Sequence, residues 1–133
     1  MPRKPYRKRK DYNPTDTKRN RIRPVLDELM GIEDPDDLML EILDILKITD
    51  LVPAVGKYYT FVYKAKTPNI LYDEHPLVAV TDIFLWGFRG INFHWGAVRQ
   101  YTWEEVIGSV HLVYKEELKD LRALPFAKIR LNS

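Results

Sequence analysis

KYYTFVYKAK, the stretch at residues 57–66, has side chains that alternate between two faces, and this alternation decides the fold predicted for the rest of the chain. Every second side chain shares one face of an extended strand, which puts Tyr59, Phe61, Tyr63 and Ala65 together. Aromatic residues favour strands with a packed face, so three of them on one side indicate that this side is buried. The stretch therefore predicts a β-strand that contributes aromatic side chains to a core.

Two further strands are predicted after this stretch, at residues 77–84 (LVAVTDIF) and 90–95 (GINFHW). We interpret the spacing of Gly87 and Gly90 as a tight reversal between them. Ile91 and Phe93 of the third strand are expected in the core. Strands joined by short loops pair antiparallel, because a parallel pair needs a long crossover connection.

Helices are predicted before these strands. Residues 24–31 (PVLDELMG) have Pro at a first helical position and Gly at the end, which is typical of one short helix. Residues 35–48 carry a broad apolar stripe, and Asp34 is placed to cap their first turn.

Further elements are predicted after the strands. Thr102 and Glu105 have the spacing of a capping box, which predicts a helix that starts at residue 103. Residues 113–123 predict another helix, which Pro125 ends. The alternation in residues 126–131 (FAKIRL) predicts a closing strand.

The expected fold class is α+β, with a short antiparallel meander or a small β-barrel, an N-terminal helix, and a C-terminal helix plus closing strand. We expect a disordered basic arm at residues 1–23, an acidic helical segment at 24–50, and the α+β core at 51–133. The arm has almost no aliphatic residues before Ile22, so it cannot bury enough apolar surface to offset the entropy of ordering.

The charges are strongly divided along the chain, although the net charge is only +2. Residues 1–23 hold ten basic and two acidic residues, or +8, whereas residues 24–50 hold one basic and nine acidic residues, or −8. Charge blocks of this kind bear on partners rather than on fold. One interpretation is intramolecular, with the arm resting on the acidic helices until a partner displaces it.

The basic arm is the main candidate for a binding site, because Lys and Arg neutralise phosphates and release counterions. Its candidate residues are Arg3, Lys4, Arg7, Lys8, Arg9, Lys10, Lys18, Arg19, Arg21 and Arg23. The ligand would be a nucleic acid or an acidic protein surface, and a merely solubilising tail is the alternative. Tyr6 and Tyr12 lie among the cations and could stack on unpaired bases.

A second candidate is a contact surface made of Tyr58, Trp86 and Arg89. The aromatic residues between 58 and 103 are too many for so small a core, so some are expected to face outward. Aromatic residues are enriched at protein interfaces. For Tyr58 and Trp86 we favour contact with protein over stacking on bases.

No catalytic motif is found in the sequence. It has no cysteine, no nucleotide-binding glycine pattern and no pair of histidines at helical metal-binding spacing. We therefore expect no catalysis, no cofactor, no metal and no small-molecule substrate. A small enzyme that uses His94 and Asp73 is the least favoured alternative. No apolar stretch is long enough to cross a membrane as a helix, so no membrane association is expected either.

Residues 56–106 contain a series of short motifs. They read GKYYTFVY at 56–63, AKT at 65–67, YD at 72–73, HPL at 75–77 and GFRGINFH at 87–94. This series resembles a small family of tailed-bacteriophage virion proteins, some of which are labelled DNA end protectors. The resemblance covers about fifty residues and leaves out the arm and the acidic helices.

The resemblance implies a phage structural or DNA-packaging protein. We expect a non-catalytic protein that docks on virion subunits and contacts DNA or an acidic partner through its arm. The alternative is a free nucleic-acid-binding accessory protein in recombination or transcription control. The expected location is the virion or the host cytoplasm, and self-association into a homo-oligomer stays open.

Overall fold

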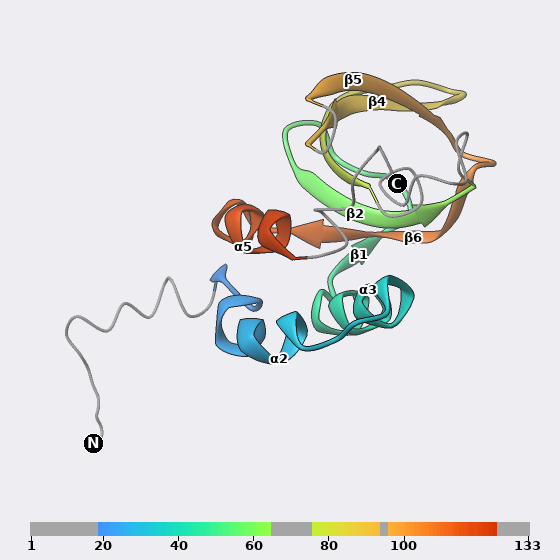
Figure 1. Ribbon diagram of the computed structural model, residues 1–133. Coiled ribbons are helices and arrows are strands. Elements are labelled where there is room, and N and C mark those ends of the chain that lie inside the picture. The colour runs from blue at the N-terminus through green and yellow to red at the C-terminus, as the bar shows by residue number, and fades with distance from the viewer. Residues whose placement is uncertain (1–18, 65–75, 94–95, 125–133) are drawn as a thin grey trace.

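A computed structural model describes residues 19–64, 76–93 and 96–124 of the chain. Within them, six antiparallel strands form one sheet in the order β1-β6-β2-β3-β4-β5, and short helices pack against it (Figure 1). The strands are β1 (Thr49–Asp50), β2 (Tyr58–Tyr63), β3 (Leu77–Ile83), β4 (Gly87–Asn92), β5 (Ala97–Thr102) and β6 (Val106–Val113). The α+β class is confirmed. The sheet is curled but not closed, because β1 and β5 remain its two edges.

The N-terminal helices follow the prediction closely. The 3-10 turn η1 (Arg23–Val25) leads into α2 (Leu26–Met30), and α3 (Pro35–Ile45) follows. The carboxylate of Asp34 accepts a hydrogen bond from the backbone N–H of Asp36 at 3.4 Å, as expected of a cap. Helix α3 ends a few residues before the predicted 48, because Leu46 turns out of helical geometry with ψ 74°.

The curled sheet encloses the first of two cores. On β2 the buried side chains of Tyr59, Phe61 and Tyr63 face inward, as the alternation predicts. Phe61 meets Phe88 of β4 and Tyr101 of β5 edge-on, with ring centroids 5.5 and 5.2 Å apart. Figure 1 shows β4 and β5 opposite β2 and β6 across this interior. Aromatic contacts across the curl therefore connect strands that are not neighbours in the sheet.

The predicted reversal at Gly87 and Gly90 is wrong, because both residues lie inside β4. The turn comes earlier, where Phe84 and Gly87 bond each other's backbones around two intervening residues. Glycine is needed at these positions for close approach. A Cβ on Gly87 would stand 2.0 Å from the Tyr101 carbonyl oxygen, and one on Gly90 would stand 2.5 Å from the Ala79 carbonyl oxygen. Ile91 alternates with buried Gly90 and Asn92 along β4, so it is 39% exposed and is not in the core.

The predicted helix at residue 103 is also wrong. The Thr102 and Glu105 pair does bond as expected, with the Glu105 carboxylate accepting from the Thr102 N–H at 3.1 Å. However, Glu105 N–H also bonds back to the Thr102 carbonyl at 3.0 Å, which closes a turn between β5 and β6. The Lys64 N–H donates to the Glu105 carbonyl at 2.7 Å, so the turn is fixed to the end of β2. Tertiary pairing overrides the local capping signal here.

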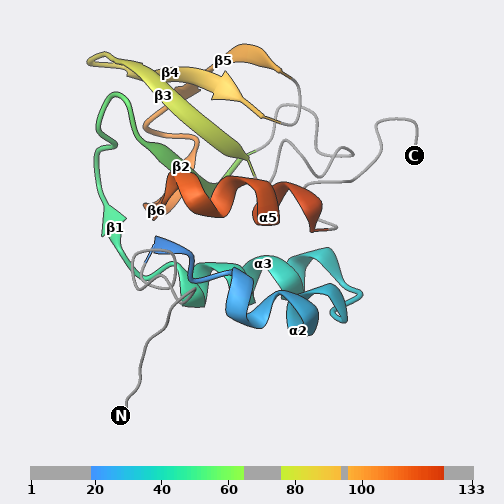
Figure 2. The same cartoon turned by 90° about the vertical axis from the view of Figure 1, so that its left-hand side faces the viewer.

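The second core lies between the sheet and the helices. Strand β6 leads into the 3-10 turn η2 (Lys115–Glu117) and α5 (Leu118–Ala123), close to the predicted helix at 113–123. Buried Leu121 and Leu124 pack with Leu38 and Ile42 of α3 and with Leu77 of β3. Figure 2 shows α5 between the sheet and the α2–α3 pair. The predicted closing strand at 126–131 lies outside the described residues.

Candidate functional site

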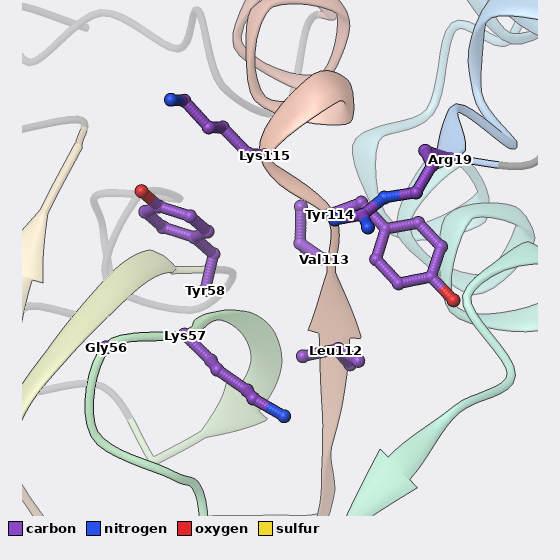
Figure 3. A pocket seen from close by; sticks show the side chains of 8 residues that line it. All are labelled: Arg19, Gly56, Lys57, Tyr58, Leu112, Val113, Tyr114 and Lys115. Atoms are coloured by element: carbon purple, nitrogen blue, oxygen red, sulfur yellow. The ribbon is translucent and has the colours of Figure 1, made fainter. Parts of the chain in front are cut away.

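The start of β2 and the end of β6 build a hollow on the surface. The register pairs Tyr58 with Val113, so Lys57 comes next to Tyr114. Figure 3 shows these side chains, with Tyr58 and Lys115 on one side of the end of β6 and Arg19 and Tyr114 on the other. The hollow has a volume of about 310 Å³. Lys57, Tyr58 and Tyr114 therefore meet here because of strand pairing.

Three cations line this hollow, namely Arg19, Lys57 and Lys115, and all three are exposed. The Arg19 guanidinium lies 4.9 Å from the centre of the Tyr114 ring, within the range of a cation–π contact. It also pairs with Glu116 at 3.4 Å, but both side chains are about half exposed, so this ion pair is weak. The positive charge therefore remains available to a ligand.

A second hollow of about 550 Å³ adjoins the first, and the two share Lys115. It is lined by Phe93 and by two more cations of α5, Lys119 and Arg122. The rings of Phe93 and Tyr58 are in contact, with centroids 6.1 Å apart, so the aromatic surface continues from one hollow to the other. We call the two together the basic groove. Its lining among the described residues includes five cations and no carboxylate.

No protein-family model matches this chain, and comparison with curated proteins and solved structures gives no significant match.

The helical segment 115–123 separates its charges between two faces. Lys115, Lys119 and Arg122 are spaced by four and three residues, which puts them on one side of a helix, and they line the groove. The carboxylates of Glu117 and Asp120 lie on another side, where they bond Arg21 and Arg23. Because these two acids are already paired, they do not cancel the field of the lysines, and the third acid of the segment, Glu116, pairs with Arg19.

The sequence assigns Arg21 and Arg23 to the binding arm, but in the structure both form ion pairs with carboxylates of the folded part. The fully buried Glu117 accepts from Arg21 Nε and Nη2 at 2.8 Å each and from the Arg21 backbone N–H at 2.6 Å. Arg23 donates from Nε to Asp120 at 2.9 Å. Ile22 between them has no exposed surface. The described residues 19–23 thus belong to the folded part, because they bury apolar and charged groups against η2 and α5.

Asn20 holds this segment in place with both ends of its amide. Its Nδ2 donates to the Glu116 carbonyl at 2.9 Å and to Asp120 Oδ2 at 3.0 Å. Its Oδ1 accepts from the backbone N–H groups of Ile22 and Arg23 at 3.1 and 2.8 Å. We call residues 20–23 the anchor. Of the predicted arm residues, only Arg19 lines the groove, whereas Arg3, Lys4, Arg7, Lys8, Arg9, Lys10 and Lys18 lie outside the described residues.

The anchor also lowers the pKa of a buried carboxyl group. Burial opposes the ionisation of Asp120, but the hydrogen bonds from Arg23 and Asn20, with the charges of Arg23 and Lys119, outweigh it. The pKa of Asp120 therefore lies below the usual value of an aspartate.

The stability contributed by Asp120 should be lost in acid. Because its pKa is lower in the folded chain than in the unfolded chain, its contribution is complete above the unfolded pKa of about 3.9 and declines as the pH falls toward the folded value. We expect the free energy of unfolding, from urea titrations at a series of pH values, to fall more steeply below about pH 4 in the natural chain than in Asp120→Asn. Equal slopes would show that this carboxylate does not carry the acid sensitivity.

The predicted contact surface is divided by the structure. Tyr58 lies in the basic groove, whereas Trp86 and Arg89 lie together at the β3–β4 hairpin. The Trp86 ring stacks on Phe84 at 4.8 Å, and the Arg89 guanidinium lies 5.2 Å from the Phe84 ring. Leu85 beside them is fully exposed. We call Phe84, Leu85, Trp86 and Arg89 the hairpin patch.

The enzyme alternative has no described site. His94 and Asp73 lie outside the described residues. Among the residues that the structure does describe, no group of three or more His, Asp or Glu side chains is placed to hold a metal ion. In the same part of the chain, none of the helices has the length and apolar character to cross a membrane.

Sequence reasoning missed most of the groove. Lys57 and Tyr114 give no local signal, since they meet through a strand pairing that the sequence did not predict. Lys115, Lys119 and Arg122 did have a signal, because their spacing is that of one helical face.

Proposed function

We propose that this protein is a non-catalytic nucleic-acid-binding protein that grips the phosphate backbone with the basic groove and with the cations of residues 1–18. The observation that carries the proposal is the groove lining, where Arg19, Lys57, Lys115, Lys119 and Arg122 surround two hollows without a carboxylate among the described residues. Each phosphate that such a surface neutralises releases counterions, which is the main source of affinity for a nucleic acid.

The arm and the groove support each other because they are joined. Residues 1–18 hold seven basic and two acidic residues, a net charge of +5, and they connect directly to Arg19 at the groove. When one of the two surfaces holds a strand, the other meets it at a high effective concentration. The combined affinity of the arm and the groove is then higher than the affinity of either one alone.

Aromatic rings in the lining favour a nucleic acid over an acidic protein. Tyr58 and Phe93 line the same hollows as the cations. Basic grooves with interleaved aromatic side chains are typical of proteins that bind nucleic-acid strands, because the cations follow the phosphates and the rings contact the bases. A nucleic-acid strand uses both kinds of side chain, whereas the acidic groups of a protein surface use only the cations.

Neutralising the groove should weaken binding in a salt-dependent way. For Lys57→Gln with Lys115→Gln, we expect the slope of log affinity against log salt to decrease by roughly 1 for each lysine removed. The measurement is fluorescence anisotropy of a short labelled DNA, single-stranded and duplex, between about 50 and 200 mM salt.

The matched control for this test is Lys47→Gln with Lys64→Gln. These lysines are exposed like the other two but do not line the groove. The control should bind as the natural chain does. If both double variants lose the same affinity, the groove has no special part in binding and the proposal fails.

The proposal extends to assembly in a tailed-phage particle, where the protein would dock on virion subunits. Support comes from the sequence resemblance and from the hairpin patch, which combines a fully exposed Leu85 with Trp86 and Arg89. Exposed apolar residues gathered in this way are typical of protein contacts. Mass spectrometry of purified particles should find this chain at a fixed stoichiometry. Its absence from particles, with DNA binding intact, would favour a free accessory protein.

A further inference from the structure

We infer that the basic groove takes a single-stranded nucleic acid, with one unpaired base stacked on the ring of Tyr58. This inference rests on the proposed function, because it names the kind of nucleic acid that the same groove would hold. It also departs from the sequence interpretation, which favoured protein contact for Tyr58. The reason for the change is where the structure places this ring.

Tyr58 is the first residue of β2, and its ring lines the hollow together with Lys57 and Lys115. Lys115 lies on the same side of β6 as the ring, whereas the side chain of Lys57 extends away from the ring (Figure 3). The ring is only partly buried, and it is supported by Phe93 at a centroid distance of 6.1 Å and an angle of 45°. A base on this ring would therefore have phosphate-binding groups close to it within the same hollow.

The other rings of the groove are already in use. The Tyr114 ring has the guanidinium groups of Arg21 and Arg19 at 4.1 and 4.9 Å from its centre. The Phe93 ring has Arg122 at 5.7 Å as well as Tyr58. Tyr58 is the lining tyrosine that no cation of the described residues contacts in this way, so we assign the base to it.

A ring inside a hollow distinguishes an unpaired base from a paired one. In a duplex the bases are stacked on one another and present only their edges in the grooves. A duplex can therefore contact the lysines through its phosphates, but between its two ends it cannot offer a base face to Tyr58. A single strand can, and stacking of this kind tolerates any base because every base has a π face.

The test compares single-stranded and duplex DNA of equal length on the full chain, by fluorescence anisotropy at one salt concentration. We expect Tyr58→Leu to weaken single-strand binding by about tenfold or more, which is the usual effect of losing one stacked base, and to leave duplex binding unchanged. Tyr58→Phe should bind both DNAs like the natural chain, because it keeps the ring. Trp86→Leu, which removes an exposed ring outside the groove, should also have no effect.

The outcomes separate this inference from the proposed function. Equal losses on both DNAs, or no loss on either, overturn the stacking of a base on Tyr58 but leave phosphate binding in place. Failure of the natural chain to bind any DNA, or equally tight binding of polyglutamate, overturns both. If Tyr58→Leu does not fold, ultraviolet crosslinking of the natural chain to oligothymidine decides the matter. A crosslink mapped to Tyr58 supports the inference, and crosslinks found only elsewhere overturn it.

Discussion

Arg21→Ala is expected to lower the free energy of unfolding by about 3–5 kcal/mol, the usual cost of breaking a buried ion pair from one side. The substitution leaves the Glu117 carboxylate, which has no exposed surface, without its guanidinium partner. It also removes the bond from Arg21 Nη2 to the Leu112 carbonyl at 3.1 Å. Urea unfolding followed by circular dichroism measures the loss.

Two comparison variants show whether burial is the cause. Arg89→Ala breaks a pair with Asp82 in which both side chains are about 40% exposed, so we expect it to cost about 1 kcal/mol or less. Arg21→Met combined with Glu117→Leu removes both buried charges and should recover part of the stability. Recovery should be incomplete, because Glu117 also accepts from the Tyr114 N–H at 2.9 Å. A cost for Arg21→Ala no greater than that for Arg89→Ala would contradict the buried-pair explanation.

Deletion of residues 2–18 is expected to reduce the affinity for DNA by roughly 10³-fold at low salt while the fold stays intact. The deletion removes seven basic residues but leaves Arg19 and the anchor in place. Deletion of residues 2–23 is expected to unfold the chain, because it also removes buried Ile22 and the partners of Glu117 and Asp120. Anisotropy measures the affinity, and circular dichroism reports whether each truncated chain folds.

A full-length chain in which the seven basic residues before Arg19 are replaced by Gln separates charge from length. We expect it to bind as weakly as the chain that lacks residues 2–18, because the affinity comes from phosphate neutralisation. Undiminished DNA binding after deletion of residues 2–18 would show that the arm does not hold the ligand. A loss of DNA binding seen only on deletion of residues 2–23 would not show that the arm holds the ligand, since that deletion also disrupts the anchor.

Local sequence signals predicted the elements whose structure depends on neighbouring residues. The cap at Asp34, the alternation from Tyr59 to Tyr63 and the run of β3 all depend on residues close in the chain, and all are confirmed. β6 was missed because its pairing with β1 and β2 is long-range. β5 was missed although it pairs with the strand directly before it, β4. The bond between Thr102 and Glu105 is the same in a helix start and in the turn observed here, so only the pairing of β6 with β2 decides between them.

The candidate site was predictable to a similar extent. The charge of the arm is visible in the sequence. The residue at which the arm ends and the folded part begins is not, because nothing local shows that Arg21 and Arg23 pair with carboxylates about a hundred residues later. The glycines of β4 show the same limit. Their spacing suggested a turn, whereas the reason for them is the approach of neighbouring backbones.

The ion pairs of the anchor have a mechanical consequence. Residues 1–18 join the fold at Arg19, and the anchor that follows is bonded to the same helical segment that carries Lys115, Lys119 and Arg122. Tension on a strand held by the arm would therefore be transmitted to that segment and, through the bond from Arg21 to the Leu112 carbonyl, to the end of β6. The basic groove and the anchor would then move together when the strand is pulled.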